Sequence, residues 1–354
     1  MSAALPLCII GAGAIGMRHV EVASASPDVT ISAIVEPHAP RRAELAAQGL
    51  PMVASLAEVP EGTRAAIIAS PTNDHFATAL ACLERGWHVL VEKPITTTPG
   101  EARRLEAEAK ARGLHLITGH HRRCHPYTQQ ARAALGTLGR LVGLSGHWSL
   151  RKHNTYYDVE WRRSPGAGPV MTNLCHEADL LAFLLGPITE VTALTSNTVR
   201  GHVIEDTAAL AFRFESGVLG SYFVSDAGAS PWSFEASSSE NPDIAGSGQD
   251  YLRFTGTEGA LEFPSLTRWG ASAPGEVEWR KPLARTPGPE TPRIDPLAEQ
   301  LRRFAALCAG GTDNVLCTAA EGRAALEVTL ATLLSARESR PVAPGEVPDD
   351  FRGH

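Results

Sequence analysis

The stretch LCIIGAGAIG at residues 7–16 decides the fold of the first part of the chain. Residues 7–10 are apolar and predict a short buried strand. Residues 14–25 have apolar side chains at helical spacing and predict a helix. A strand that passes through a glycine-rich turn into a helix is the first unit of an α/β domain.

The three glycines of this turn have separate predicted roles. Gly11 permits the tight bend, Gly13 lets the backbone approach a pyrophosphate, and Gly16 lets the helix pack on the strand. The first N–H groups of the helix, at Ala14 and Ile15, favour a phosphate at the same place. The spacing therefore predicts a dinucleotide-binding turn, and a plain strand–helix turn is the alternative.

Strands and helices alternate over the rest of the first third. Further strands are predicted at residues 30–36, 65–70, 88–92 and 114–118, and helices at 41–48, 74–85 and 101–112. Strands separated by helices of this length form parallel βαβ units, and right-handed crossovers make the sheet doubly wound. We expect a Rossmann domain over residues 1–122.

Beyond residue 122 strands follow one another with few helices between them. They are predicted at residues 141–150, 191–196, 207–214, 218–224 and 251–255, with helices at 127–135, 170–185, 295–309 and 319–338. The stretch 271–292 is rich in proline and glycine and is expected to be a loop. We therefore expect a second domain over residues 123–354, of α+β type, with a largely antiparallel open sheet.

Composition narrows the class of protein. The chain has 354 residues, 43% of them hydrophobic, a net charge of −7 and a pI near 6.0, which argues against a nucleic-acid partner. No apolar run is long enough to span a bilayer, and the first apolar stretch is a strand and not a signal peptide. Six scattered cysteines without a Cys-x-x-Cys pair predict reduced thiols. We expect a cytoplasmic protein without a membrane partner.

Glu36 ends the second predicted strand, about 20 residues after the last glycine. An acidic side chain there accepts hydrogen bonds from the adenosine ribose and repels a 2′-phosphate, which favours NAD. Arg41 and Arg42 leave NADP possible. A solvated strand end is the alternative for Glu36.

The charged pair Glu92-Lys93 comes at the end of a buried strand, where α/β sheets bind their ligands. Pro94 restricts the conformation of Lys93, so the lysine is expected to point into the crevice. A lysine desolvated in such a site can act as a general acid or base. An ordinary exposed lysine is the alternative.

A polar cluster lies on the predicted helix 170–185. Thr172, Asn173, His176 and Asp179 are three or four residues apart, and α-helical spacing places them close to one face. Such a cluster on a largely apolar helix needs partners or a ligand. A buried hydrogen-bonded pair of His176 and Asp179 is the simpler alternative.

Taken in order, these motifs resemble the Gfo/Idh/MocA oxidoreductases, the family of glucose–fructose oxidoreductase and inositol dehydrogenase. The resemblance covers nearly the whole chain. It is carried by the glycine turn and by ASPTNDH at 69–75, EKP at 92–94, GHHRR at 119–123, WRR at 161–163, NLCHEAD at 173–179, EDT at 205–207 and GTEG at 256–259.

The resemblance implies a hydride transfer between a nicotinamide cofactor and a secondary alcohol or ketone of a sugar, polyol or cyclic diol. It implies Lys93 and His176 as acid–base groups. The cofactor would be contacted by the glycine turn, Glu36, Ser70, Pro71, Asn73, His75, Glu92, Lys93 and His121. Relatives are commonly homodimers or homotetramers, and the open sheet could pair with a copy of itself.

One position departs from the family pattern. Well-known sugar dehydrogenases of the family carry an aspartate four residues before the histidine, where this chain has Thr172.

Candidates for substrate contact are Lys93, Arg122, Arg123, Tyr157, Trp161, Thr172, Asn173 and His176. The arginines could instead be structural, and Trp161 could belong to the core.

Two other functions stay open. Some relatives use NAD transiently to cleave glycosidic bonds, and a Rossmann protein can also be a non-catalytic NAD-binding regulator. The cluster His120, His121, Cys124 and His125 invites a metal interpretation, but its spacing is not a usual zinc pattern. No metal is predicted.

Overall fold

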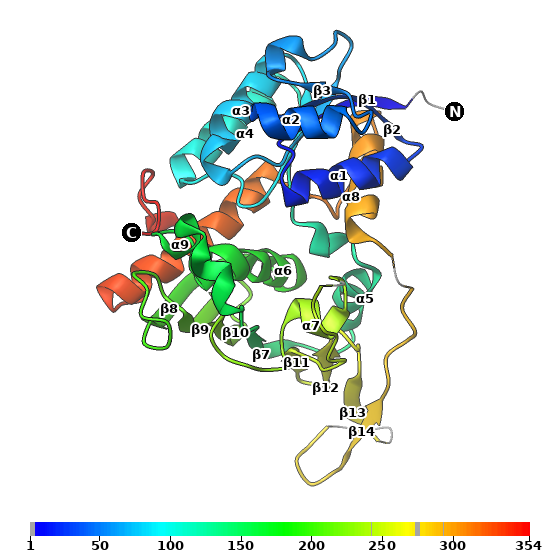
Figure 1. Cartoon of the computed structure of the whole chain (residues 1–354). Helices are drawn as coiled ribbons and strands as arrows, with labels where there is room; N and C mark the ends of the chain where they lie inside the picture. The colour runs from blue at the N-terminus through cyan, green and yellow to red at the C-terminus, as the bar shows by residue number, and fades with distance from the viewer. Residues whose placement is uncertain (1–3, 242, 273–276, 293) are drawn as a thin grey trace. The chain divides into compact units, whose positions relative to one another are not determined.

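The computed structural model describes residues 4–241, 243–272, 277–292 and 294–354, which form two compact units (Figure 1). The first comprises Met1–His125 and Ile294–Leu326, and the second comprises Pro126–Arg293 and Glu327–His354. The first unit thus contains, besides the predicted residues 1–122, a late segment that the sequence analysis assigned to the second domain. Within the described residues no helix has the length and apolar character needed to cross a membrane.

The sheet of the first unit has the strand order β15-β6-β5-β4-β1-β2-β3. The described strands are β1 (Leu5–Ile10), β2 (Val29–Val35), β3 (Met52–Val53), β4 (Ala65–Ile68), β5 (His88–Val91), β6 (Leu116–Thr118) and β15 (Cys317–Thr318). All pairs are parallel except that of β15 with β6. The order reverses at β1, which confirms the doubly wound sheet and places the ligand-binding switch point between β1 and β4.

The helices of the first unit follow the predicted pattern. They are α1 (Ala14–Ala25), α2 (Ala39–Ala46), α3 (Thr72–Glu84), α4 (Pro99–Ala111) and α8 (Pro296–Cys308), with short 3₁₀ helices η1 (Leu56–Glu58) and η2 (His121–Cys124). Several begin two residues before the predicted start. In α4 the reason is visible, because the Thr98 hydroxyl accepts the Glu101 N–H at 3.3 Å and Pro99 occupies the first turn.

The sheet of the second unit has the order β14-β13-β12-β11-β7-β10-β9-β8. Its strands are β7 (Leu141–Ser149), β8 (Ile188–Ser196), β9 (Thr207–Phe214), β10 (Leu219–Ser225), β11 (Leu252–Gly256), β12 (Gly259–Phe263), β13 (Arg268–Ala271) and β14 (Leu283–Thr286). All pairs are antiparallel except that of β7 with β10. Side chains in β9 alternate between buried and exposed, so this sheet has one covered and one open face.

Two predictions for the second domain are wrong. The stretch 271–292 was expected to be a loop, but it contains the end of β13 and all of β14; its residues 273–276 lie outside the described residues. The helix expected over 170–185 is a π-helical turn, η5 (Val170–Leu174), followed by α6 (Cys175–Leu185). The apolar pattern of the sequence does not distinguish i→i+4 from i→i+5 hydrogen bonding over a single turn.

The remaining helices are α5 (Pro126–Leu135), α7 (Phe234–Ser238) and α9 (Ala319–Glu338), with the short helices η3 (Asn154–Asp158), η4 (Glu160–Arg163) and η6 (Pro344–Glu346). The helix α9 starts in the first unit and ends in the second. All six cysteines are buried thiols outside disulfides, and their spacing predicted reduced thiols.

Candidate active site

In the first unit, the candidate residues follow the carboxyl ends of neighbouring parallel strands. The glycine turn comes after β1, Glu36 after β2, Ser70 after β4, Lys93 after β5 and His121 after β6. Parallel strands end at the same edge of a sheet, so the topology brings these segments to one edge. The order of the elements predicted this position for the glycine turn, Glu36 and Lys93, and the family resemblance implied it for Ser70 and His121.

The glycine turn has the geometry that its spacing predicted. Gly11 has φ of +95°, and a Cβ there would lie 2.8 Å from backbone atoms of Ala69 and Ser70. A Cβ on Gly16 would lie 2.0 Å from the Gly11 carbonyl oxygen, so both positions require glycine. A Cβ on Gly13 would meet no protein atom within 4 Å. The space beside Gly13, at the start of α1, is therefore open to a ligand phosphate.

The Glu36 carboxylate is fixed beside this turn. Its Oε2 accepts the Ala12 N–H at 3.1 Å, and its Oε1 accepts the His38 N–H at 2.8 Å. The carboxylate borders a cavity of about 500 Å³. The cavity is lined by Ala12, Gly13, Glu36, His38, Pro40, Arg41 and Glu44. A carboxylate at this place is suited to accept hydrogen bonds from ribose hydroxyls.

Both arginines near Glu36 have partners. Arg41 Nη1 lies 2.9 Å from each carboxylate oxygen of Glu44. Arg42 Nη1 donates to the carbonyl oxygens of Glu36 at 2.7 Å and Pro37 at 2.9 Å. The positive charge of Arg41 is thus offset by a carboxylate within the same cavity, which favours NAD over a cofactor with a 2′-phosphate.

The loop after β4 contains a buried hydroxyl that suits a ligand. The Ser70 Oγ is buried and has no hydrogen-bond partner among the residues that the structure describes. Pro71 and Asn73 are exposed at the start of α3, where they can border a ligand. A buried hydroxyl without a partner is unfavourable unless a bound group supplies the hydrogen bond. These residues fit a dinucleotide cofactor.

His75 connects this loop to the loop after β5. Its Nδ1 lies 2.9 Å from the Pro94 carbonyl oxygen, and its Nε2 lies 2.9 Å from the Ser70 carbonyl oxygen. Burial lowers the pKa of His75, and the two carbonyl contacts only partly offset this effect. The His75 ring is buried, and its two contacts connect the loop after β4 with the loop after β5.

Glu92 is a buried anion with a defined partner. Its Oε1 lies 2.9 Å from His19 Nε2, and its Oε2 accepts the Lys93 N–H at 3.2 Å. Burial raises the pKa of Glu92, but the His19 hydrogen bond and the charges of His121 and Lys93 outweigh it and lower the pKa to about 2. His19 was not identified from the sequence, where it is an ordinary helix residue. The half-buried Lys93 directly follows this buried anion, and the Lys93–Pro94 peptide bond is cis.

The residues after β6 form the short helix η2. Arg122 and Arg123 are both buried there. Arg123 Nη1 donates to Glu321 Oε1 at 2.7 Å, within the same unit. This ion pair favours the structural alternative for Arg123. The substrate role of Arg122 and the cofactor role of His121 remain predictions.

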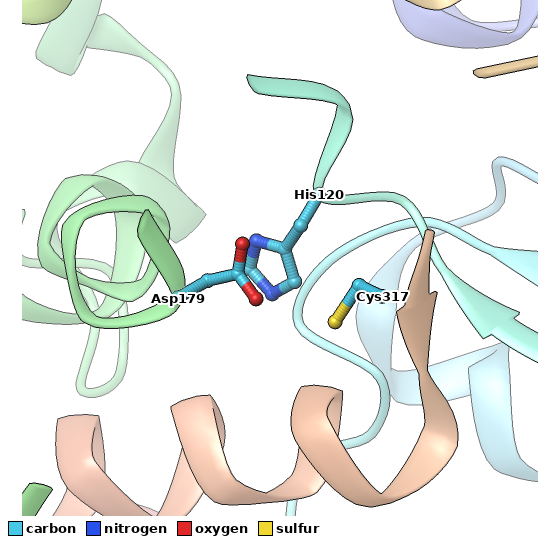
Figure 2. A group of neighbouring side chains, drawn as sticks. All are labelled: His120, Asp179 and Cys317. Carbon is cyan, nitrogen blue, oxygen red and sulfur yellow. The ribbon is translucent and has the colours of Figure 1, made fainter. Parts of the chain in front are cut away.

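Figure 2 shows His120 after β6 and Cys317 on β15, two strands that pair with each other; Asp179, also drawn, belongs to the second unit. His120 and Cys317 offer donor atoms within 4.8 Å of each other. Burial raises the pKa of the Cys124 thiol to about 12.

In the second unit, the π-helical turn η5 carries Thr172 and Asn173, and α6 carries His176. The prediction that α-helical spacing aligns these side chains is wrong, because a π-turn has more residues than an α-turn. Thr172 Oγ1 lies 3.0 Å from the Gly168 carbonyl oxygen and 2.9 Å from Asn173 Oδ1. His176 is buried, and its acid–base role remains a prediction.

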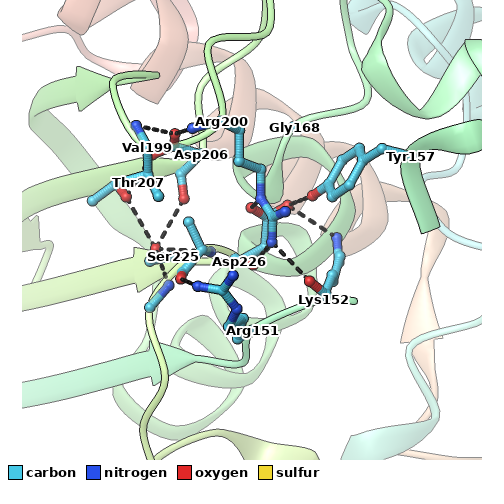
Figure 3. Close-up of polar contacts among 12 residues, drawn as sticks. Arg151, Lys152, Tyr157, Gly168, Val199, Arg200, Asp206, Thr207, Ser225 and Asp226 are labelled. Carbon is cyan, nitrogen blue, oxygen red and sulfur yellow. Dashed lines mark hydrogen bonds and ion pairs between the residues drawn. The ribbon is translucent and has the colours of Figure 1, made fainter. Parts of the chain in front are cut away.

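A lysine that the sequence analysis missed contacts both polar residues of this turn. Lys152 Nζ lies 3.1 Å from Asn173 Oδ1, 3.4 Å from Thr172 Oγ1 and 3.4 Å from Asp226 Oδ2. Figure 3 shows Lys152 beside Asp226, which Arg200 Nε also contacts at 3.1 Å. Lys152 follows β7, and Asp226 follows β10. These two strands pair in parallel and both end at the pair of Ser149 with Ser225, so the two residues come after the same end of the sheet. No sequence motif marks them, since the pairing of β7 with β10 joins segments far apart in the chain.

The predicted substrate residues Tyr157 and Trp161 lie in different surroundings. Tyr157 is buried and donates its hydroxyl to Asp226. Burial and this carboxylate raise the pKa of Tyr157 well above its usual value. Trp161 is 58% exposed, so it is not a core residue. Its role as a substrate contact remains a prediction.

Glu205 supports the start of the same turn. Its Oε1 accepts the Val170 N–H at 3.0 Å, and a Cβ on Gly168 would lie 2.1 Å from that oxygen. Burial raises the pKa of Glu205 to about 7, although the Val170 N–H partly opposes the shift. The carboxylate of Asp226 raises this pKa further, and Lys152 lowers it. The motif at 205–207 was noted in the sequence without a role for the glutamate.

Comparison with known proteins identifies the family of both domains. Residues 6–120 match the family model described as "Oxidoreductase family, NAD-binding Rossmann fold", and residues 128–262 match that of the "GFO/IDH/MocA C-terminal domain". The chain belongs to the Gfo/Idh/MocA family of oxidoreductases. Its first domain is the NAD-binding Rossmann domain of the family, as the motifs predicted.

Curated members of the Gfo/Idh/MocA family match parts of the chain. The rhizopine catabolism protein MocA of Rhizobium meliloti is 31% identical over 58% of this chain and 65% of its own length. A UDP-N-acetylglucosamine 3-dehydrogenase of Acidithiobacillus ferrooxidans is 37% identical over 50% of this chain and 53% of its own. The chain thus spans between half and two thirds of the length of these relatives.

The fold agrees with that of solved structures over nearly the whole chain. The crystal structure of a putative NADPH-dependent oxidoreductase from Desulfitobacterium hafniense superposes with a TM-score of 0.82 at 18% identity. The match covers 98% of this chain and 99% of that one. It confirms the predicted fold of a Rossmann domain followed by an open-sheet α+β domain.

Proposed function

We propose that this chain is an NAD-dependent dehydrogenase that acts on a secondary alcohol of a sugar, polyol or cyclic diol, or reduces the matching ketone. The observation that carries the proposal is the position of Lys93. It directly follows β5, next to the buried Glu92 anion and at the same edge of the sheet as the glycine turn. Two relatives named as dehydrogenases of UDP-N-acetylglucosamine and inositol support the substrate class.

The proposed cofactor site follows the edge of the sheet. The N–H groups at Gly13, Ala14 and Ile15 would bind the pyrophosphate, and these three residues are exposed. Glu36 would accept the ribose hydroxyls. Ser70, Pro71, Asn73, His121 and Glu92 would border the rest of the cofactor, with His75 holding the loops in place.

The chemistry divides between cofactor and protein. When bound, NAD supplies the nicotinamide ring that accepts the hydride. Lys93 Nζ takes the hydroxyl proton as the alcohol becomes a carbonyl, and it returns that proton in the reverse direction. His176 is proposed as the second acid–base group, from the family resemblance. Lys93, Arg122, Trp161, Thr172, Asn173 and His176 are proposed to orient the substrate.

The test is a dehydrogenase assay with NAD and with NADP against a panel of sugars, polyols and cyclic diols, read by nicotinamide absorbance. We expect turnover with NAD, and a loss of about 10²–10⁴-fold in kcat for Lys93→Ala. NADH binding should persist in this variant. Lys110→Ala, which removes an exposed lysine from α4, is the control. Full turnover by Lys93→Ala would overturn the proposed role of Lys93.

The same assay separates the alternatives. Cleavage of a glycoside without accumulation of NADH would identify an NAD-dependent glycosidase. Binding of NADH without oxidation of any panel member would favour a non-catalytic regulator. Lys93 at the cofactor edge favours the dehydrogenase over the regulator, which has no need of an acid–base group there.

We also propose that the chain forms a homodimer or homotetramer through the open face of its second sheet. Several exposed residues of this sheet are small or apolar, and exposed charged residues such as Arg213 and Arg253 lie on it as well. The small or apolar residues include Val142, Leu194, Ala209, Ala211, Leu219 and Ser221. Exposed apolar side chains gathered on one sheet face are typical of a surface that packs against another protein.

A further inference from the structure

His19 joins the helix of the glycine turn to the segment that carries Lys93. It lies in α1, which begins directly after Gly13, and its side chain is 2% exposed. Its Nε2 lies 2.9 Å from Oε1 of Glu92, the residue that precedes Lys93. An ionised carboxylate has no hydrogen to donate, so His19 Nε2 is the donor. The helix that starts at the proposed pyrophosphate site therefore also holds the carboxylate next to Lys93.

The Glu92 carboxylate is held from several sides. Its Oε2 accepts the Lys93 N–H at 3.2 Å, and the Glu92 N–H donates to the Ile68 carbonyl oxygen at 2.8 Å. A Cβ on Gly119 would lie 3.1 Å from Glu92 Oε1, so the glycine after β6 leaves this space to the carboxyl group. Glu92 is 6% exposed. The carboxylate is therefore fixed between His19 and Lys93.

The charge of Glu92 depends on His19. Burial favours the protonated form of a carboxyl group, because it penalises the charged form. In Glu92 burial raises the pKa, and the hydrogen bond and the charge of His19 are the largest effects that oppose it. The charges of His121 and Lys93 oppose it further, and the pKa falls to about 2. Loss of the His19 donor would therefore shift Glu92 towards its protonated form.

The other titratable groups around Glu92 do not take the place of His19. His121 and Lys93 act on Glu92 through their charges. Lys93 is the proposed acid–base group, so its charge changes as it takes and returns the hydroxyl proton. His75 responds to the charge of Glu92, but burial lowers the pKa of His75, which favours its neutral form. His19 is thus the partner that stays in place through a reaction at Lys93.

We propose that His19 is a positioning residue, which keeps Glu92 ionised so that a fixed negative charge stabilises the positive charge that Lys93 gains in the reaction. Lys93 Nζ becomes an ammonium group when it takes the hydroxyl proton of the alcohol, and a neighbouring anion favours that form. A protonated Glu92 would supply no such charge. The inference rests on the proposed dehydrogenase function and adds a residue that acts through Glu92.

The first test compares His19→Leu with His19→Gln. Leucine has no donor, whereas the glutamine amide can place an N–H close to the position of His19 Nε2. We expect His19→Leu to lower kcat by about tenfold, a part of the contribution of about 10²–10⁴-fold that an acid–base group makes. His19→Gln should recover most of this loss. The KM for the substrate and the Kd for NADH should stay close to their wild-type values, because the substitution leaves the glycine turn and the proposed substrate residues unchanged.

The second test observes the charge of Glu92 by infrared spectroscopy of the full chain with NAD. A protonated carboxyl group has a carbonyl band that a carboxylate lacks. The difference between His19→Leu and the double variant with Glu92→Gln isolates this band, and we expect it to be present at pH 5. The difference between the wild type and Glu92→Gln should show no such band at pH 5, since the pKa of Glu92 is about 2. His19→Gln should resemble the wild type.

His115→Leu is the matched control. His115 directly precedes β6, at the opposite edge of the sheet from Lys93, and its ring stacks on His88 with centroids 5.0 Å apart. This variant should change neither kcat nor the Glu92 band. Thermal unfolding shows that each variant is folded. If leucine at position 19 prevents folding, His19→Asn replaces it, because the asparagine amide is one carbon shorter and does not reach Glu92 Oε1.

Three results would overturn the inference: wild-type kcat in His19→Leu, an equally low kcat in His19→Gln, or a Glu92 that stays ionised at pH 5 in His19→Leu. The infrared measurement requires no turnover. If the wild type oxidises no member of the panel, the proposed dehydrogenase function fails, while the Glu92 band still decides whether His19 keeps this group ionised.

Discussion

Glu205 illustrates how a single carboxyl group can make the protein sensitive to pH. It accepts the Val170 N–H beside the closely packed Gly168, and burial raises its pKa from 4.5 to about 7. The folded state therefore holds this proton more tightly than the unfolded chain does. Stability from this group is fully present below pH 4.5 and is lost as the pH rises through about 7.

We expect Glu205→Gln to remove this dependence, since the glutamine Oε1 can still accept the Val170 N–H. Between pH 5 and 8, the wild type should lose up to about 3 kcal/mol of unfolding free energy relative to the variant. Urea denaturation at several pH values measures the difference. Glu215→Gln changes an exposed carboxyl of the same unit and is the control. Parallel pH profiles for wild type and Glu205→Gln would contradict the prediction.

At the scale of elements, the β1–α1 unit allows the folding and binding roles of its glycines to be separated. A Cβ at position 16 collides with the Gly11 carbonyl oxygen, whereas a Cβ at position 13 enters open space. Gly16→Ala should therefore destabilise the protein by about 1–3 kcal/mol, the usual cost of overpacking. Gly13→Ala should leave stability within about 0.5 kcal/mol and weaken NADH binding, because the methyl group occupies the proposed pyrophosphate site.

Thermal unfolding and a fluorescence titration with NADH measure the two effects on the same samples. Each variant serves as the control for the other. Wild-type affinity for NADH in Gly13→Ala would show that the pyrophosphate binds elsewhere. Wild-type stability in Gly16→Ala would show that α1 can move away from β1 without cost.

The helices and strands also show where local sequence patterns are insufficient to predict the structure. The ends of α1 and α9 agree with the prediction to the residue, because apolar spacing and helix boundaries are local properties. The two-residue strands β3 and β15 were missed, since two residues carry no alternation. The π-turn η5 was predicted as α-helix, which changed the relation of Thr172 to His176. Hydrogen bonds to Glu205 and Lys152, distant in the sequence, accompany that turn.

At the scale of the whole molecule, the open face of the second sheet should determine the oligomeric state. Ala211 on β9 lies opposite Ser221 on β10, and both are exposed. Ala211→Glu would place an unpaired carboxylate in the proposed interface, which costs about 3–5 kcal/mol when buried. We expect the dissociation constant of the oligomer to rise by more than about a hundredfold.

Sedimentation velocity over a range of protein concentrations measures this change. Ser24→Glu adds the same charge to an exposed position of α1 and should leave the oligomer intact. An Ala211→Glu protein that stays oligomeric would place the interface elsewhere. A wild type that is monomeric at all concentrations would contradict the proposal itself.

The sequence by itself determined the family of this protein and the edge of the parallel sheet at which the cofactor is expected. Gly11, Gly16, Glu36 and Lys93 follow strands whose order along the chain already sets their places in a parallel sheet, since βαβ crossovers have a fixed hand. The family resemblance also predicted that Thr172 stands where related sugar dehydrogenases carry an aspartate.

Only the tertiary structure decided which groups surround that position. Lys152 reaches Thr172 because β7 and β10 pair in parallel, and Cys317 joins the first sheet because the chain returns to it after the second unit. The His19 contact with Glu92 likewise joins side chains from separate elements. Such contacts depend on the packing of distant segments, and local periodicity carries no information about that packing.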